Sequence, residues 1–155
     1  MISPNRYIIH MKNYLLLFGL LVSSLSFGQV DNQTRYISDS RQFFMWSPEK
    51  DSYELKETEY ENSLIDIREI GSKSNGYVVI SLTDNGVTRM YHGSITDFNS
   101  KDNEGSWSLR SKILQSKLTY DPKKNTFTYM YEAGDKRYNK IFVFNVATDK
   151  IVSVN

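Results

Sequence analysis

Apolar and polar residues alternate with a period of two along most of the chain from residue 41 onward, a pattern typical of β-strands with one buried face. The clearest example is the segment 76–83 (GYVVISLT), in which every second residue from Val78 to Leu82 is apolar. Asn85-Gly86 follows it, and this dipeptide accepts the positive φ angles of a type I′ turn. The sequence therefore predicts a hairpin in which residues 86–93 return antiparallel to the first strand.

A second hairpin is predicted between residues 117–120 and 126–132. Pro122 stands in the connecting turn at a position where its fixed φ angle is favourable, and the Asp121 side chain can bond the backbone of the same turn. Residues 138–146 (YNKIFVFNV) then carry apolar side chains on both faces, which indicates a central strand covered on both sides.

Three segments depart from this regular alternation. The apolar phase changes between Ile113 and Leu114, which predicts a bulge or bend within a strand. Residues 94–99 (SITDFN) have the composition of a single capped helical turn. Residues 29–40 are polar enough to form a flexible N-terminal arm.

Together these patterns predict an all-β fold of about eight to ten short strands in one domain over residues 41–155. Short turns and the lack of any long amphipathic segment favour sequential pairing into an antiparallel meander. Such a sheet removes its exposed edges either by closing into a barrel or by packing as a sandwich. The sequence leaves both arrangements open.

The first 28 residues have the pattern of a cleavable signal peptide. Lys12 precedes the apolar run 14–22 (YLLLFGLLV), and the small residues Ser26 and Gly28 match a cleavage site before Gln29. The run is shorter than the roughly 20 apolar residues that a membrane span requires, so no stable membrane anchor is expected after cleavage. The protein is therefore expected to be exported to the periplasm or the cell exterior.

The start of translation is open, because Met11 begins a typical leader while residues 1–10 do not resemble one. Both starts lead to the same exported chain.

Composition and charge exclude several classes of protein. The 155 residues contain no cysteine, so disulfides, thiolate metal sites and cysteine nucleophiles are excluded. Lys and Arg number 19 against 18 Asp and Glu, a net charge of +1. Loss of the leader removes Arg6 and Lys12 and leaves a weakly acidic chain, which argues against nucleic acid as a partner.

The chain shows no motif for catalysis, for a cofactor or for a metal. His92 is the only histidine after the leader, and no G-x-S-x-G elbow, phosphate loop or dinucleotide fingerprint is present. Two acidic stretches, Glu57 to Glu61 and Asp97 to Glu104, are interpreted as solvated strand and turn segments and not as calcium sites. No catalytic, cofactor-binding or metal-binding residue is therefore assigned.

Aromatic residues are the more suggestive feature, because tyrosine and tryptophan can line an apolar cavity or form a stacking platform for a sugar. The five candidate ligand-binding residues are Trp46, Tyr91, Trp107, Tyr129 and Tyr131.

The favoured hypothesis is a non-enzymatic binding or interaction module of the cell envelope or exterior, with a protein, a glycan or a small apolar ligand as its partner. An alternative is a lipocalin-like carrier of a small apolar ligand. However, the Gly-x-Trp sequence of that family is absent, since Phe44-Met45 precedes Trp46. A second alternative is a hydrolase that uses two carboxylates, whose separation in space the sequence does not give.

Overall fold

The computed structural model describes residues 31–112, 114–132 and 140–154, and these residues form an all-β domain of antiparallel strands, as predicted. The strands in chain order are β1 (Asp31–Ser47), β2 (Ser52–Glu59), β3 (Ser63–Ile70), β4 (Ser72–Asp84), β5 (Val87–Lys101), β6 (Glu104–Arg110), β7 (Gln115–Asp121), β8 (Thr126–Glu132) and β9 (Lys140–Val154). None of the described segments is a helix that could cross a bilayer.

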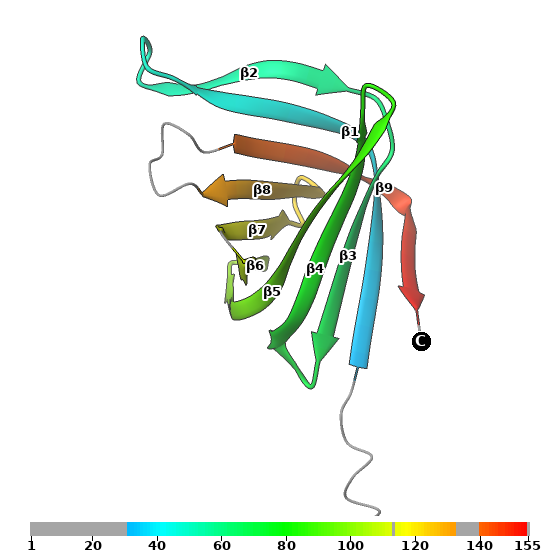
Figure 1. The fold of residues 1–155 in the computed structure, drawn as a ribbon. Helices are drawn as coiled ribbons and strands as arrows, with labels where there is room; N and C mark the ends of the chain where they lie inside the picture. Colours follow the sequence, from blue (N-terminus) through cyan, green and yellow to red (C-terminus); the bar gives the residue numbers. More distant parts are fainter. Residues whose placement is uncertain (1–30, 113, 133–139, 155) are drawn as a thin grey trace, which may run out of the picture. The chain divides into compact units, whose positions relative to one another are not determined.

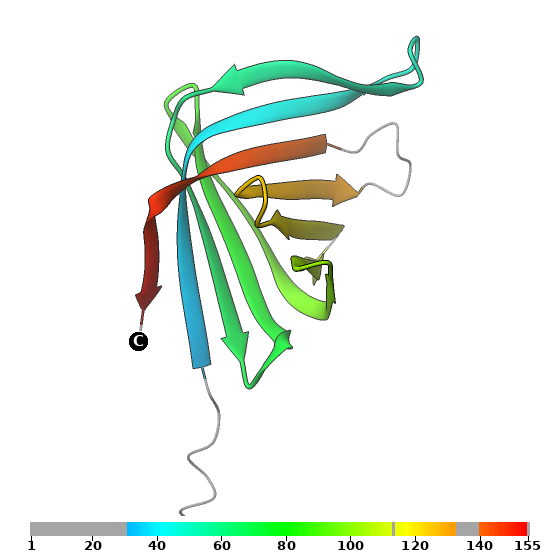
Figure 2. The ribbon, with the colours of Figure 1, turned by 180° about the vertical axis from the view of Figure 1, so that it is seen from behind.

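The strands form a meander that closes into a barrel, so the barrel is the correct one of the two predicted arrangements. Each strand from β3 to β8 pairs antiparallel with the next, and β9 pairs back onto β1 (Figure 1 and Figure 2). This pairing closes a ring of eight strands. Closure gives each strand in the ring a hydrogen-bonded partner on both sides, although residues 151–154 of β9 pair with β1 alone. Paired edges of this kind are not available for aggregation.

β2 lies outside the closed ring. The first half of β1 pairs with β3, whereas residues 41–47 pair with β2, which leads into β3 through residues 60–62. The second half of β1 and β2 therefore make a hairpin at the end of the barrel, visible at the top of Figure 1. A bulge at Lys56 interrupts the register of this hairpin.

The sequence assigned residues 29–40 to a flexible arm, of which residues 29 and 30 lie outside the described residues, but residues 31–40 form the first part of β1. Their polar side chains are ordinary for a strand that faces solvent on one side, and two cross-strand ion pairs hold them to β3. Arg35 Nε lies 2.7 Å from Asp66 Oδ1, and Arg68 binds Asp31. On the inner face, Tyr36 packs on Phe127, with 4.8 Å between ring centroids.

Both predicted hairpins are confirmed. Asn85 and Gly86 have φ angles of +49° and +76°, as a type I′ turn requires, and they join β4 to β5. In the β7–β8 turn, Asp121 Oδ1 accepts hydrogen bonds from the backbone N–H groups of Lys123 at 2.9 Å and Lys124 at 3.3 Å. The turn residues therefore act through the local chemistry that the sequence indicated.

Two local predictions are wrong. Residues 94–99 are part of β5 and not a helical turn, because ladder bonds to β6 satisfy their backbone, with a register shift between Ile95 and Asp97. The phase change at Leu114 does not lie inside a strand, because it falls in the connection between β6 and β7. Ile113 itself lies outside the described residues.

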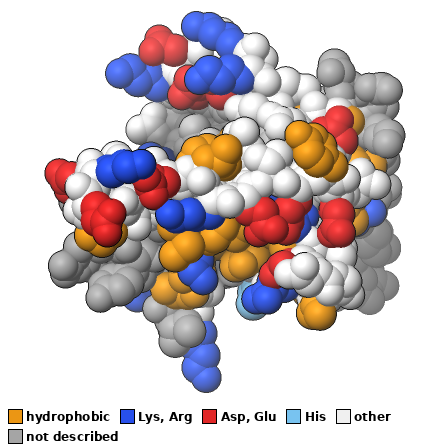
Figure 3. All heavy atoms as spheres, turned by 90° about the horizontal axis from the view of Figure 1, so that it is seen from above, with side chains coloured by type: hydrophobic (Ala, Val, Ile, Leu, Met, Phe, Trp, Pro, Cys, Tyr) orange, Lys and Arg blue, Asp and Glu red, His pale blue; other side chains and the backbone are white. Residues whose placement is uncertain are grey.

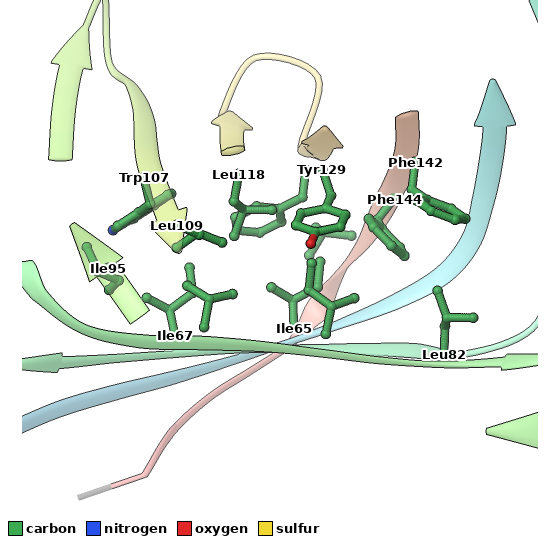
Figure 4. Packing of buried hydrophobic residues seen from close by; sticks show 14 residues of the cluster. Ile65, Ile67, Leu82, Ile95, Trp107, Leu109, Leu118, Tyr129, Phe142 and Phe144 are labelled. Atoms are coloured by element: carbon green, nitrogen blue, oxygen red, sulfur yellow. The ribbon is translucent and has the colours of Figure 1, made fainter. Parts of the chain in front are cut away.

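The barrel interior is filled with apolar side chains from seven strands (Figure 4). Ile65, Val78, Leu118, Phe127 and Phe144 are 0% exposed, so no water-sized void touches them. A long ligand therefore has no free channel along the middle of the barrel. Space for ligands remains at the two ends.

These two ends are distinct. The amino-terminal end holds the beginning of β1 and the β3–β4, β5–β6 and β7–β8 turns. The hairpin end holds the β4–β5 turn and the β1–β2 hairpin.

Residues 141–146 contribute Phe142, Phe144 and Val146 to the core, while Ile141 and Val143 are half-buried on the outer face.

Candidate functional site

A cavity of about 240 Å³ opens at the amino-terminal end of the barrel, and we call it the Trp107 pocket. The strands that form it expose their inward-facing side chains here because the alternation of each strand continues past the filled core. Its apolar wall consists of Tyr36, Ile67, Phe98, Trp107 and Tyr120. Its polar residues are Asn32, Thr34, Glu69, Lys73, Ser100 and Asn103, with Gly105 beneath them.

The aromatic rings of this pocket pack against one another. The ring centroids of Phe98 and Trp107 are 5.2 Å apart, and those of Tyr36 and Tyr120 are 5.8 Å apart. Gly105 makes room for the indole, because a Cβ at this position would lie 3.0 Å from Trp107 Cη2. The wall is thus a preformed aromatic surface and does not need to be assembled by a ligand.

Trp107 supplies the least expected feature of the pocket. The residue is 7% exposed, and its Nε1 atom is buried without a hydrogen-bond partner. A buried donor left unbonded costs about 1–3 kcal/mol, so buried groups of this kind are rare. In Figure 4 the nitrogen lies on the side of the ring that faces away from Leu118 and Tyr129. The donor therefore has no acceptor among the described residues, although it is buried beside the pocket.

The rim of the Trp107 pocket is polar and balanced in charge. Glu69 Oε2 accepts a 3.3 Å hydrogen bond from the Asn32 amide, and Lys73 Nζ lies 5.0 Å from the centroid of the Phe98 ring. Among the described residues, the side chains of Thr34 and Ser100 make no hydrogen bond to another protein group. One acid, one base and free hydroxyl groups suit a neutral polar ligand better than an ion.

Burial affects the ionisation of the wall as well. It raises the pKa of Tyr36, and the neighbouring Tyr120 and Glu69 raise it further. The Tyr36 hydroxyl therefore stays protonated well above neutral pH and can both donate and accept a hydrogen bond.

A second aromatic group lies at the hairpin end. Tyr91 is 5.6 Å from Tyr129 and 6.2 Å from Tyr131 between ring centroids, and it is 5.6 Å from Phe142. These tyrosines border a cavity of about 390 Å³ whose rim includes Met90 and other residues of β5 and of the β6–β7 connection. Burial raises the pKa of both Tyr91 and Tyr129.

The five aromatic residues predicted from the sequence do not form one site. Tyr91, Tyr129 and Tyr131 come together at the hairpin end, whereas Trp107 belongs to the amino-terminal end. Trp46 lies on the β1–β2 hairpin, where its ring packs edge-on against Tyr53 at 5.1 Å.

Tyr36, Phe98 and Tyr120 line the pocket with Trp107, although the sequence did not indicate them as site residues. Tyr36 had been assigned to the flexible arm and Phe98 to the helical turn. A strand period of two puts Tyr36 on the same face as Thr34 and Phe98 on the same face as Ser100, and this period was the signal that could have placed them on an inner face.

A buried charged group lies where the β1–β2 hairpin joins the barrel. Arg41 is 2% exposed, and its guanidinium binds the Glu59 carboxylate, the Ser63 hydroxyl at 3.3 Å and the backbone carbonyl of Thr83. Glu59 and the neighbouring Glu57 line the same small cavity as Arg41. The sequence predicted that the stretch Glu57 to Glu61 is solvated. Instead, Glu59 is the counter-charge of the buried Arg41.

The other polar candidates are placed without forming a reactive group. The Asp84 carboxylate is bound by Arg89 at 2.6 Å and by the Asn85 amide at 3.1 Å, while His92 is exposed. In the part of the chain that the structure describes, no group of three or more His, Asp or Glu side chains is arranged to hold a metal ion.

Comparison with known proteins adds no candidate function. The chain matches no family model, and no curated protein or solved structure shows significant similarity to it. Its function must therefore be argued from the geometry of its own sites.

Proposed function

We propose that this protein is an exported, non-enzymatic binding module whose principal ligand site is the Trp107 pocket, and that the ligand is a neutral, polar ring such as a sugar unit of a glycan. The observation that carries the proposal is the unbonded, buried indole N–H of Trp107 in an aromatic wall. A ligand oxygen that accepts this hydrogen bond recovers the free energy that the unpaired donor costs.

The size and chemistry of the pocket favour a sugar over a larger apolar molecule. Its volume of about 240 Å³ is below the roughly 300 Å³ at which pockets for drug-sized ligands begin. Aromatic rings stack against the apolar face of a sugar, while Thr34, Ser100 and Asn103 can bond its hydroxyl groups. Because Trp107 Nε1 is itself buried, a ligand oxygen can reach it only if a neighbouring side chain moves.

Tryptophan fluorescence tests this proposal directly, because the chain contains two tryptophans. The variant Trp46→Phe leaves Trp107 as the single reporter. Titration with glucose, galactose and N-acetylglucosamine is expected to change the Trp107 emission in a saturable way for at least one of them.

Removing the Thr34 hydroxyl group then tests whether the sugar binds in the Trp107 pocket. Thr34→Val keeps the shape of the side chain and is expected to weaken binding by about three- to tenfold, which is the value of one hydrogen bond. The matched control is Thr128→Val on the outer face of β8, which should leave the affinity unchanged. No saturable response to any of the sugars, or equal binding by both valine variants, would rule out the proposed site.

The tyrosine cavity at the hairpin end supports a second candidate function, the carriage of a small apolar ligand. Its volume of about 390 Å³ and its tyrosine and methionine lining favour this chemistry. A carrier should copurify with its ligand, so native mass spectrometry of freshly isolated protein should show an added mass that Tyr131→Ala removes. Bare protein in that spectrum would eliminate this candidate.

Export remains part of the proposal, and the position of the β domain supports it. The compact unit begins at Asp31, directly after the cleavage site expected before Gln29. When the full chain is produced in a host with a general secretory pathway, the intact mass of the exported product should correspond to a chain that begins at Gln29. A product that retains residues 1–28 in the cytosol would contradict export.

A further inference from the structure

The β1–β2 hairpin has a free strand edge. Among the described residues, β2 pairs with β1 and with no other strand, so one row of its backbone N–H and C=O groups lacks a ladder partner. An unpaired edge of this kind is a template for another strand. The edge is therefore expected either to pair with another strand or to carry a feature that prevents such pairing.

An apolar row on the outer surface leads to this edge. Across four neighbouring strands, the paired positions Leu55, Phe44, Ile141 and Met130 lie side by side on the outer face. Leu55 ends the row at the free edge and is 49% exposed. In Figure 3, which views the molecule from the side of the hairpin, hydrophobic side chains lie at the surface between acidic and basic ones.

We propose that the occupant is a second copy of this chain, which pairs with β2 antiparallel about a twofold axis through Leu55. Two identical strands that pair antiparallel are related by a twofold axis perpendicular to the sheet, so one residue must lie opposite its own copy. With the axis at Leu55, leucine meets leucine and the apolar row continues into the second molecule. Glu54 then lies opposite Lys56 of the other copy, twice in the dimer.

Other positions of the axis are unfavourable. An axis through any charged residue of β2 places that residue opposite its own copy, and like charges directly opposite each other are destabilising. An axis through Thr58 sets Glu57 against Glu59. An axis through Ser52 or Tyr53 lies so near the start of the strand that most of β2 stays unpaired. The charges on the edge thus select one register.

The expected association is weak and does not continue into a fibre. The bulge at Lys56 interrupts the ladder, so at most the seven residues 52–58 can pair, and they bury less surface than a permanent interface does. The dimer uses the free edge of β2 in both molecules, so its twofold symmetry closes the assembly at that edge.

Cross-linking tests the register. The chain has no cysteine, so Leu55→Cys introduces its only thiol. Directly opposite residues in an antiparallel pair have Cα atoms about 4.5–5.5 Å apart, within the range that a disulfide spans. Mild oxidation of Leu55→Cys should give a disulfide dimer rapidly. The control Val87→Cys carries an equally accessible thiol on the β4–β5 hairpin, since Val87 is 61% exposed, and should remain mostly monomeric.

Charge reversal tests the pairing in solution by sedimentation equilibrium of the purified protein. Glu54→Lys and Lys56→Glu each place like charges opposite one another and should weaken dimerisation by about tenfold or more. The double variant Glu54→Lys/Lys56→Glu restores the attraction and should dimerise like the original protein. This restoration would show that the losses in the single variants come from the placement of charge, and circular dichroism of each single variant checks its fold.

The inference fails if the unmodified protein remains monomeric at millimolar concentration. It also fails if both thiol variants cross-link at the same rate, or if the double reversal does not restore association.

Discussion

The buried Arg41 provides the most informative test of how the hairpin is held to the barrel. Its guanidinium joins three strands other than its own, because it binds Glu59 of β2, Ser63 of β3 and Thr83 of β4. Burial lowers the pKa of Arg41, and nearby carboxylates, with Glu61 first among them, oppose this shift. Arginine remains charged in proteins, so the fold must compensate a buried cation.

Arg41→Met removes the charge and keeps much of the side-chain length. The substitution leaves the Ser63 hydroxyl, which is 0% exposed, and the Glu59 carboxylate without their partner. Removing one member of a buried ion pair typically costs about 3–5 kcal/mol, and the lower part of this range applies here because Glu59 is still 19% exposed. The free energy of unfolding should therefore fall by about 3 kcal/mol.

Urea unfolding monitored by circular dichroism measures this loss from the transition midpoint at unchanged slope. The matched control is Arg35→Met on the same strand, because the Arg35 side chain is 40% exposed and pairs with Asp66 at the surface. An exposed pair contributes about 0–1 kcal/mol. The double variant Arg41→Met/Glu59→Leu should recover much of the stability, since an apolar pair can replace a buried ion pair. Equal losses for Arg41→Met and Arg35→Met would refute the reasoning.

Two further predictions concern backbone strain and surface charge. Gly76 has a φ of +137°, and a Cβ there would lie 1.9 Å from a backbone carbonyl oxygen of β3, so Gly76→Ala should destabilise the domain by about 3 kcal/mol or more. Gly71→Ala, with a φ of +73° but open space around it, should cost only about 1–2 kcal/mol in the same urea assay. Hydrogen bonds from Lys50 and Lys56 lower the pKa of Glu54 from 4.5 to about 2, so its stabilising contribution is present above about pH 4.5 and is lost as the pH falls toward 2. An NMR titration of the Glu54 carboxyl carbon should show this low pKa and its rise in Lys56→Met, and a midpoint near 4.5 in the unmodified protein would contradict the ion pairing.

The strands and the tight turns were the predictable part of the fold. The alternation in residues 76–83 and the Asn85-Gly86 dipeptide identified the β4–β5 hairpin, because side-chain period and positive φ angles are properties of a few adjacent residues. The errors arose where a distant strand decided the outcome. Pairing with β3 and β9 orders residues 31–40, and pairing with β6 extends β5 through residues 94–99.

The candidate sites were predictable only as a set of residue types. Tyr91, Tyr129 and Tyr131 were singled out for their aromatic character, and the structure brings them together from β5 and β8. Nothing in the sequence separates them from Trp107, which shares their chemistry but lies at the other end of the barrel.

By itself the sequence determined that this protein is built from antiparallel strands joined by short turns, since these features depend on local alternation and turn chemistry. Only the tertiary structure decided that β1 closes on β9, that β2 is left with a free edge, and that Arg41 is buried beside Glu59. These outcomes depend on the register between strands far apart in the chain. A shift of one residue in that register would turn every inward side chain outward, and no short stretch of sequence specifies it.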